Sequence, residues 1–139
     1  MFPLKNKQIV VIEDNPGNLA VMTTILQMEG AKTGFERWGT MTITRLHALW
    51  PVDLILLDLM FPNGVTGWDV FTTIRAEPKF ADVPIVAVSA MDANFALPKA
   101  REMGFTGYIA KPIDIDRFPG QLLKVLNREP VWQAMPVRH

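Results

Sequence analysis

The sequence predicts an α/β protein built around a parallel sheet, and three observations indicate this class. Short apolar runs alternate with longer amphipathic runs along the chain, which is typical of strand–helix units. The apolar runs are nearly continuous, as expected for strands in a sheet that helices cover on both faces. The length of 139 residues suits one domain with a substantial core, and no internal repeat divides it.

The first predicted strand is residues 8–12, a run that is almost entirely aliphatic. A turn at residues 15–18 follows it, and Pro16 suits the first turn of a helix. Apolar residues recur at helical spacing over residues 19–29, and Gly30 suits the end of that helix. This stretch therefore predicts one complete strand–helix unit.

A second unit starts with a shorter and less apolar strand at residues 32–36. Its helix begins near residues 39–40 and stops before Pro51, because proline disfavours helical backbone at the residue before it. The third strand is residues 53–58, a strongly apolar run, and the loop 59–67 after it is rich in turn formers.

The second half of the chain repeats the pattern, with a helix at residues 68–76 and a strand at 84–89. Pro98 creates a local conflict, because a proline in a helix interior costs about 3 kcal/mol. We therefore predict that residues 91–97 form a loop. Pro98 then occupies the first turn of a short fourth helix, which Gly104 ends.

The last strand–helix unit consists of a strand at residues 107–110 and a helix at about 114–127. The residues beyond it include two prolines and no clear periodic pattern. We therefore predict one domain at residues 1–128 and an irregular surface tail at 129–139. The tail is too short for an output domain.

The composition limits the function classes. The chain has 14 basic and 14 acidic side chains and a formal net charge of zero, which argues against a broad nucleic-acid surface. It has no cysteine and only two histidines, so thiolate sites are excluded and a multi-histidine metal site is not expected. The sequence shows no signal-peptide pattern and no run near the ~18 apolar residues of a membrane span, which favours a cytoplasmic protein.

Charged and polar side chains lie at the carboxyl ends of four of the predicted strands. They are Glu13, Asp14, Asp58, Ser89 and Lys111. Because ligands bind outside the carboxyl ends of the strands in an open α/β sheet, we expect these side chains to share one site. Three carboxylates suit a hard cation such as Mg²⁺, and Lys111 supplies positive charge for a phosphoryl oxygen. An aspartate can form an acyl phosphate by in-line attack.

In this order, with a strand before each group, these residues resemble the receiver domains of the two-component response-regulator family. The matching residues are Glu13, Asp14, Asn15, Asp58, Pro62, Gly67, Ser89, Lys111 and Pro112. The resemblance covers about residues 8–127. It implies a flavodoxin-like (βα)5 doubly wound sandwich, with a five-stranded parallel sheet in the order 2-1-3-4-5.

The resemblance also implies a role for each acidic residue. Asp58 is the phosphoacceptor, and a histidine kinase or histidine phosphotransfer protein supplies its phosphoryl group. Asp14, Asp58 and the backbone carbonyl of Met60 hold Mg²⁺. Glu13 contributes to the metal site through water.

On the other strands, the resemblance implies that Lys111 and Ser89 contact the phosphoryl group. Ser89 and Tyr108 act as switch residues that report phosphorylation, and the Lys111–Pro112 peptide bond is cis. The chain is then not an enzyme, apart from its own phosphorylation and dephosphorylation.

The resemblance implies output through protein contact. Phosphorylation alters the face formed by the fourth helix, the fifth strand and the fifth helix, where a downstream protein binds and a homodimer can form. We expect no direct contact with nucleic acid or membrane.

Three alternative functions are considered, because the chain departs from the receiver pattern at one position and partly matches two other classes of protein. Gly67 lies nine positions after Asp58, one more than is common in the family, so a pseudo-receiver that binds partners without phosphorylation stays open. A phosphohydrolase of the haloacid dehalogenase type needs a second acid where Met60 stands. A nucleotide-binding flavodoxin-like module needs a glycine loop where residues 13–14 are acidic.

Overall fold

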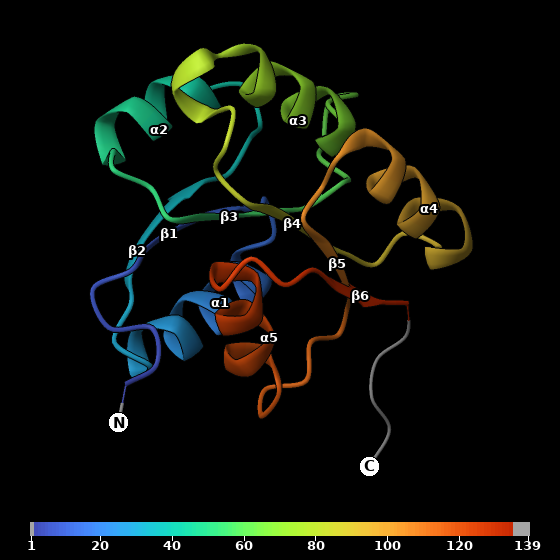
Figure 1. The fold of residues 1–139 in the computed structure, drawn as a ribbon. Helices are drawn as coiled ribbons and strands as arrows, with labels where there is room; N and C mark the ends of the chain where they lie inside the picture. Colours follow the sequence, from blue (N-terminus) through green and yellow to red (C-terminus); the bar gives the residue numbers. More distant parts are fainter. Residues whose placement is uncertain (1, 135–139) are drawn as a thin grey trace.

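The computed structural model describes residues 2–134, whose strands form one parallel sheet in the order β2-β1-β3-β4-β5-β6 (Figure 1). The strands are β1 (Gln8–Ile12), β2 (Lys32–Glu36), β3 (Leu54–Leu57), β4 (Ile85–Ser89), β5 (Gly107–Ala110) and β6 (Val131–Gln133). The helices are α1 (Pro16–Met28), α2 (Thr42–Leu49), α3 (Gly67–Ala76), α4 (Ala93–Met103) and α5 (Phe118–Leu126), with a 3-10 turn at Pro78–Phe80. The predicted alternation of strands and helices is therefore confirmed.

Two hydrophobic layers enclose the sheet, as the continuous apolar strands predict. One layer packs α2, α3 and α4 on one face, and the other packs α1 and α5 on the opposite face (Figure 1). All four residues of β3 are buried, because both of its faces are covered. Within the described residues, none of the helices has the length and hydrophobicity needed to cross a lipid bilayer.

The sheet has one strand more than predicted. The order 2-1-3-4-5 is confirmed for the first five strands, but β6 pairs with the outer edge of β5. The prediction of an irregular tail at 129–139 is therefore wrong for residues 131–133, while residues 135–139 lie outside the described part. A three-residue strand produces too short a pattern to detect in sequence, since its pairing depends on a partner more than 20 positions away.

The prediction for α4 is also wrong. Residues 93–97 are helical rather than a loop, and Pro98 lies inside the helix. The Asp92 side chain caps the helix by accepting from the Asn94 amide at 3.0 Å, and the buried Ala96 and Ala100 pack the helix onto the core. Capping and burial outweigh the cost of the proline, and the local sequence rule does not include these contributions.

The predicted fifth helix starts later than expected. Residues 114–117 precede α5 as a turn, in which an Asp114 carboxylate oxygen accepts from the amides of Asp116 and Arg117 at 3.0 and 3.2 Å. An aspartate side chain that bonds the next amides favours such a turn over helix.

Candidate functional site

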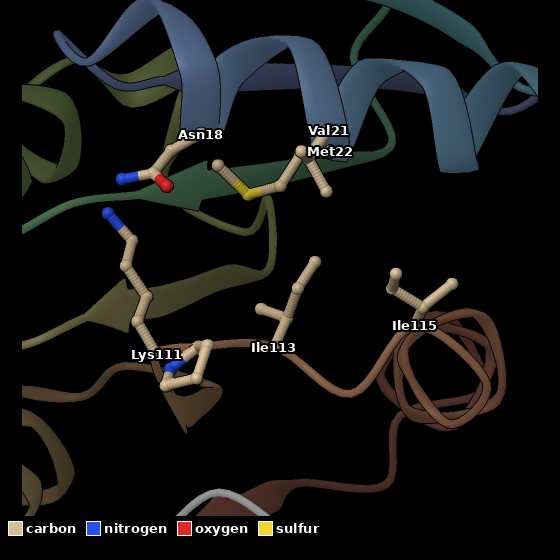
Figure 2. Close-up of a pocket in the computed structure, with 7 residues that line it drawn as sticks. Asn18, Val21, Met22, Lys111, Ile113 and Ile115 are labelled. Atoms are coloured by element: carbon tan, nitrogen blue, oxygen red, sulfur yellow. The ribbon is translucent and has the colours of Figure 1, made fainter.

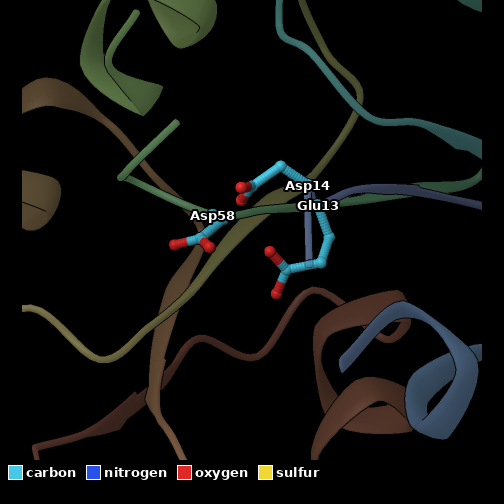
Figure 3. A group of neighbouring side chains, drawn as sticks. All are labelled: Glu13, Asp14 and Asp58. Carbon is cyan, nitrogen blue, oxygen red and sulfur yellow. The ribbon is translucent and has the colours of Figure 1, made fainter. Parts of the chain in front are cut away.

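Three carboxylates gather at the carboxyl ends of β1 and β3 (Figure 3). Glu13, Asp14 and Asp58 each offer an oxygen, and these oxygens all lie within 4.8 Å of one another. The two strands are neighbours in parallel register, with Ile12 opposite Leu57. The residues that follow them must therefore meet at one edge of the sheet, as predicted.

Lys111 completes the cluster from the end of β5. Its ammonium nitrogen lies 3.1 Å from an oxygen of Asp58 and pairs with Glu13 at short range. The cation is thus shared between a fully buried carboxylate and the Asp58 carboxylate, which is itself buried. Lys111 therefore supplies positive charge directly beside two of the three carboxylates.

The Glu13 carboxyl is perturbed by its buried position in the site. Burial, together with the nearby Asp58, raises the pKa of Glu13 to about 7, although Lys111 opposes the shift. A carboxyl group in this environment gains from a cation, because a positive charge offsets both the desolvation and the repulsion between carboxylates.

The backbone amides of the next two residues hold the Asp58 side chain in place. One carboxylate oxygen accepts from the amides of Leu59 and Met60 at 2.7 and 3.3 Å, while the other faces Lys111. Met60 is half exposed, and its backbone lies beside the Asp58 side chain. The role of its carbonyl as a metal ligand stays a prediction.

Gly67 lets α3 begin directly against this backbone. A Cβ at Gly67 would lie 2.5 Å from the Leu59 Cα and still closer to the Asp58 carbonyl oxygen. The Gly67 amide also donates to the Leu59 carbonyl at 2.9 Å. No side chain fits between these two stretches of chain, which explains a glycine at the predicted position.

The longer loop after Asp58 forms a tight turn away from the carboxylates. Met60 bridges to Thr66, and the Phe61 amide donates to the Val65 carbonyl at 3.2 Å. Asn63 and Gly64 occupy its tip with positive φ values of 63° and 77°. The additional residue therefore lengthens the turn without separating Gly67 from Leu59.

Ser89, Tyr108 and Pro112 lie where the sequence predicts. Ser89 and Tyr108 are fully buried, and the Lys111–Pro112 bond is cis, as expected. The Tyr108 hydroxyl donates to the Met91 carbonyl at 3.0 Å, and the Met91 amide donates to Ser89 Oγ at 3.1 Å. These two bonds join the predicted switch residues in one chain of contacts.

The structure adds two features that sequence reasoning missed. Arg37, after β2, donates to the backbone carbonyl of Asp14 at 3.2 Å, and its only sequence signal is its position after a strand. The second feature is an apolar pocket of about 250 Å³ beside Lys111. Figure 2 shows Val21 and Met22 of α1 facing Ile113 and Ile115 across it.

The donor set of the site fits a hard divalent cation. Oxygen ligands from two or three carboxylates, one of them partly exposed, match the preferences of Mg²⁺, which keeps several water or phosphate ligands. In the described part of the chain this is the one cluster of its kind. The site therefore combines an acidic cluster at the ends of β1 and β3 with a lysine that follows β5.

Comparison with known proteins shows the family to which the chain belongs. Residues 9–123 match the response regulator receiver domain. The chain is 35% identical over 106 residues to the DNA-binding response regulator MtrA of Mycolicibacterium smegmatis, covering 76% of this chain and 44% of MtrA. It is 29% identical over 112 residues to the polar-differentiation response regulator DivK of Brucella ovis, covering 81% of this chain and 89% of DivK.

Solved structures show the same fold. A response regulator from Desulfuromonas acetoxidans superposes with a TM-score of 0.76 at 21% identity, covering 87% of this chain and 97% of the other. The chemotaxis response regulator CheY4 of Vibrio cholerae gives 0.73 at 20% identity, covering 89% and 98%. The chain belongs to the response regulator receiver domain family, whose place is in two-component signalling.

Proposed function

We propose that the chain is a phosphoryl-accepting switch in which Asp58 takes a phosphoryl group from a histidine kinase or a histidine phosphotransfer protein. The observation that carries this proposal is the 3.1 Å contact of Lys111 with Asp58, beside two further carboxylates. We propose the chain as a cytoplasmic signalling domain rather than an enzyme with a separate substrate.

In the proposed reaction, the Asp58 oxygen attacks the phosphorus of a phosphohistidine in line with the phosphorus–nitrogen bond. The new oxygen–phosphorus bond forms as that bond breaks, and the histidine nitrogen keeps the electron pair. Lys111 pairs with an oxygen of the transferred group, and Ser89 offers its hydroxyl from the next strand. Asp14, Asp58 and the Met60 carbonyl would hold Mg²⁺, with Glu13 acting through water. When bound, Mg²⁺ neutralises the negative charge that develops on the phosphoryl oxygens.

The apolar pocket supports a docking site for the phosphodonor. Lys111 lines this pocket and also contacts Asp58, so a protein seated there brings its histidine close to the acceptor. Val21 and Ile115 are exposed by 45% and 61% and offer apolar contact to such a partner. Output through the α4-β5-α5 face, with a downstream protein or a second copy, completes the proposal.

The decisive experiment measures the intact mass of the full chain after incubation with Mg²⁺ and acetyl phosphate. One phosphoryl adduct is expected in the wild type and in Asp116→Asn, a matched control at an exposed aspartate. Asp58→Asn should carry none. A wild type without an adduct would instead favour a pseudo-receiver that acts by binding alone.

A further inference from the structure

β6 covers the edge of the sheet that β5 would otherwise expose (Figure 1). Its three residues pair in parallel with residues 107–109 of β5, and Trp132 lies opposite Tyr108. All three are only partly buried. β6 is therefore a short edge strand beside a residue of the candidate switch.

Contacts with both flanking helices hold β6 in place. The Trp132 ring lies 4.7 Å from the guanidinium of Arg101 in α4 and packs against the core layer that contains Tyr108. On the other side, Gln133 accepts a hydrogen bond from Gln121 of α5. β6 thus joins the two helices that border β5.

The close approach of β6 requires Gly107. A Cβ at this position would lie 2.6 Å from the Val131 carbonyl oxygen, which belongs to the backbone of β6. A side chain at residue 107 and a docked β6 are therefore mutually exclusive.

Two routes connect β6 with the acceptor site. The first runs from Tyr108 through the Met91 carbonyl, and from the Met91 amide to Ser89, with bonds of 3.0 and 3.1 Å. The second is spatial, because Ala134 directly after β6 lines a pocket of about 340 Å³ together with Ser89 and Lys111. These contacts therefore link the residues of the acceptor site with β6.

We propose that β6 is a releasable strap whose hold on β5 weakens when the acceptor site is filled. This inference rests on the proposed function of Asp58. A phosphoryl group that accepts from the Ser89 hydroxyl draws the loop after β4 toward Asp58, and the Met91 carbonyl moves away from Tyr108. Tyr108 then loses the hydrogen bond that fixes its side chain, so the pairing of β6 with β5 at Tyr108 and Trp132 weakens.

The physical basis is the small size of β6. Three partly buried residues at a sheet edge open at a lower free energy than the central strands, so a local change at Tyr108 is enough to release them. Coupling of this kind is reciprocal. A variant that detaches β6 should therefore favour the filled state of the acceptor site.

Hydrogen exchange of the full chain tests the strap, measured with and without Mg²⁺ and beryllium fluoride as a phosphoryl mimic. Filling the site should raise amide exchange in residues 131–133 about fivefold or more. Exchange in β2, at the opposite edge of the sheet, should not change. Gly107→Ala provides the reference for complete release.

A second arm needs no phosphoryl group. Tyr108→Phe removes the hydroxyl and should raise exchange in β6. The control Thr33→Val lies in β2, at the opposite edge of the sheet, and removes the hydroxyl that accepts a hydrogen bond from Gln27 of α1. It should leave exchange in β6 unchanged. Unchanged β6 exchange in Tyr108→Phe overturns the strap, as does unchanged exchange when the site is filled. A wild type that forms no acetyl phosphate adduct overturns the proposed function instead, and the Tyr108→Phe arm still decides whether Tyr108 holds the strap.

Discussion

At the residue scale, Gly67 shows how closely the site depends on the backbone around it. The start of α3 lies against the Asp58 and Leu59 backbone with no room for a Cβ. Backbone cannot rotate aside as the end of a long side chain can, so a methyl group here must displace either α3 or the backbone of Asp58 and Leu59.

We expect Gly67→Ala to lower the free energy of unfolding by about 1–3 kcal/mol, as overpacking does. Urea unfolding followed by circular dichroism measures it. Gly120→Ala is the matched control, since nothing lies within 4 Å of its Cβ position in α5 and alanine favours helix. It should be neutral or stabilising by up to about 1 kcal/mol. Equal effects of the two changes would contradict the packing argument.

Glu13 makes the stability of the metal-free protein depend on pH. Burial and Asp58 raise its pKa from 4.5 to about 7, so the folded state binds more protons than the unfolded state in this range. The free energy of unfolding should therefore fall as pH rises from 4.5 to about 7, by at most about 3 kcal/mol from this group.

Urea unfolding in a chelator across this pH range checks the expectation. Glu13→Gln should lack the part of the slope that Glu13 contributes, so the difference between the two proteins isolates that group. A wild type and variant with parallel pH profiles would show that Glu13 does not carry the effect.

At the element scale, α4 forms although Pro98 lies in its interior. The cap at Asp92 and the buried Ala96 and Ala100 stabilise it. Pro98 is exposed, so its ring costs backbone hydrogen bonding without disturbing the core. Replacing Pro98 should therefore restore backbone hydrogen bonding and stabilise the helix.

Pro98→Ala should raise the free energy of unfolding by about 1–2 kcal/mol, because the gain in helix outweighs the added entropy of the unfolded chain. Pro78→Ala is the control, for which we expect the free energy of unfolding to change in the opposite direction. Pro78 begins the 3-10 turn, where proline fits, so its loss should destabilise by about 0.4–1 kcal/mol. Thermal or urea unfolding distinguishes the two, and a destabilised Pro98→Ala would mean that the proline supports α4.

At the scale of the whole molecule, the carboxylate cluster and the apolar pocket share Lys111, and the proposed docking of a donor protein depends on this proximity. Ile115→Ser should slow phosphoryl transfer from a histidine phosphotransfer protein about tenfold, the effect of losing roughly 1.4 kcal/mol of apolar contact. Rapid-quench assays measure it.

Phosphorylation by acetyl phosphate tests the reaction at Asp58 without the docking of a donor protein. Ile115→Ser should react with acetyl phosphate as the wild type does, because Asp58 and Lys111 are untouched. Met28→Ser changes another exposed apolar residue, at the far end of α1, and should leave both reactions unchanged. Slower reaction of Ile115→Ser with acetyl phosphate would indicate damage to the site itself.

The sequence by itself determined the alternation of strands and helices and the positions of Glu13, Asp14, Asp58, Ser89 and Lys111 at the ends of strands. These follow from local signals, since apolar runs predict buried strands and the ends of parallel strands meet. The order of the first five strands came from the resemblance to the receiver family. Only the tertiary structure decided that β6 extends the sheet, that α4 continues through Pro98 and that α1 and the segment after β5 enclose a pocket. Each of these depends on contacts between segments far apart in the chain, where a neighbour's packing outweighs the local preference.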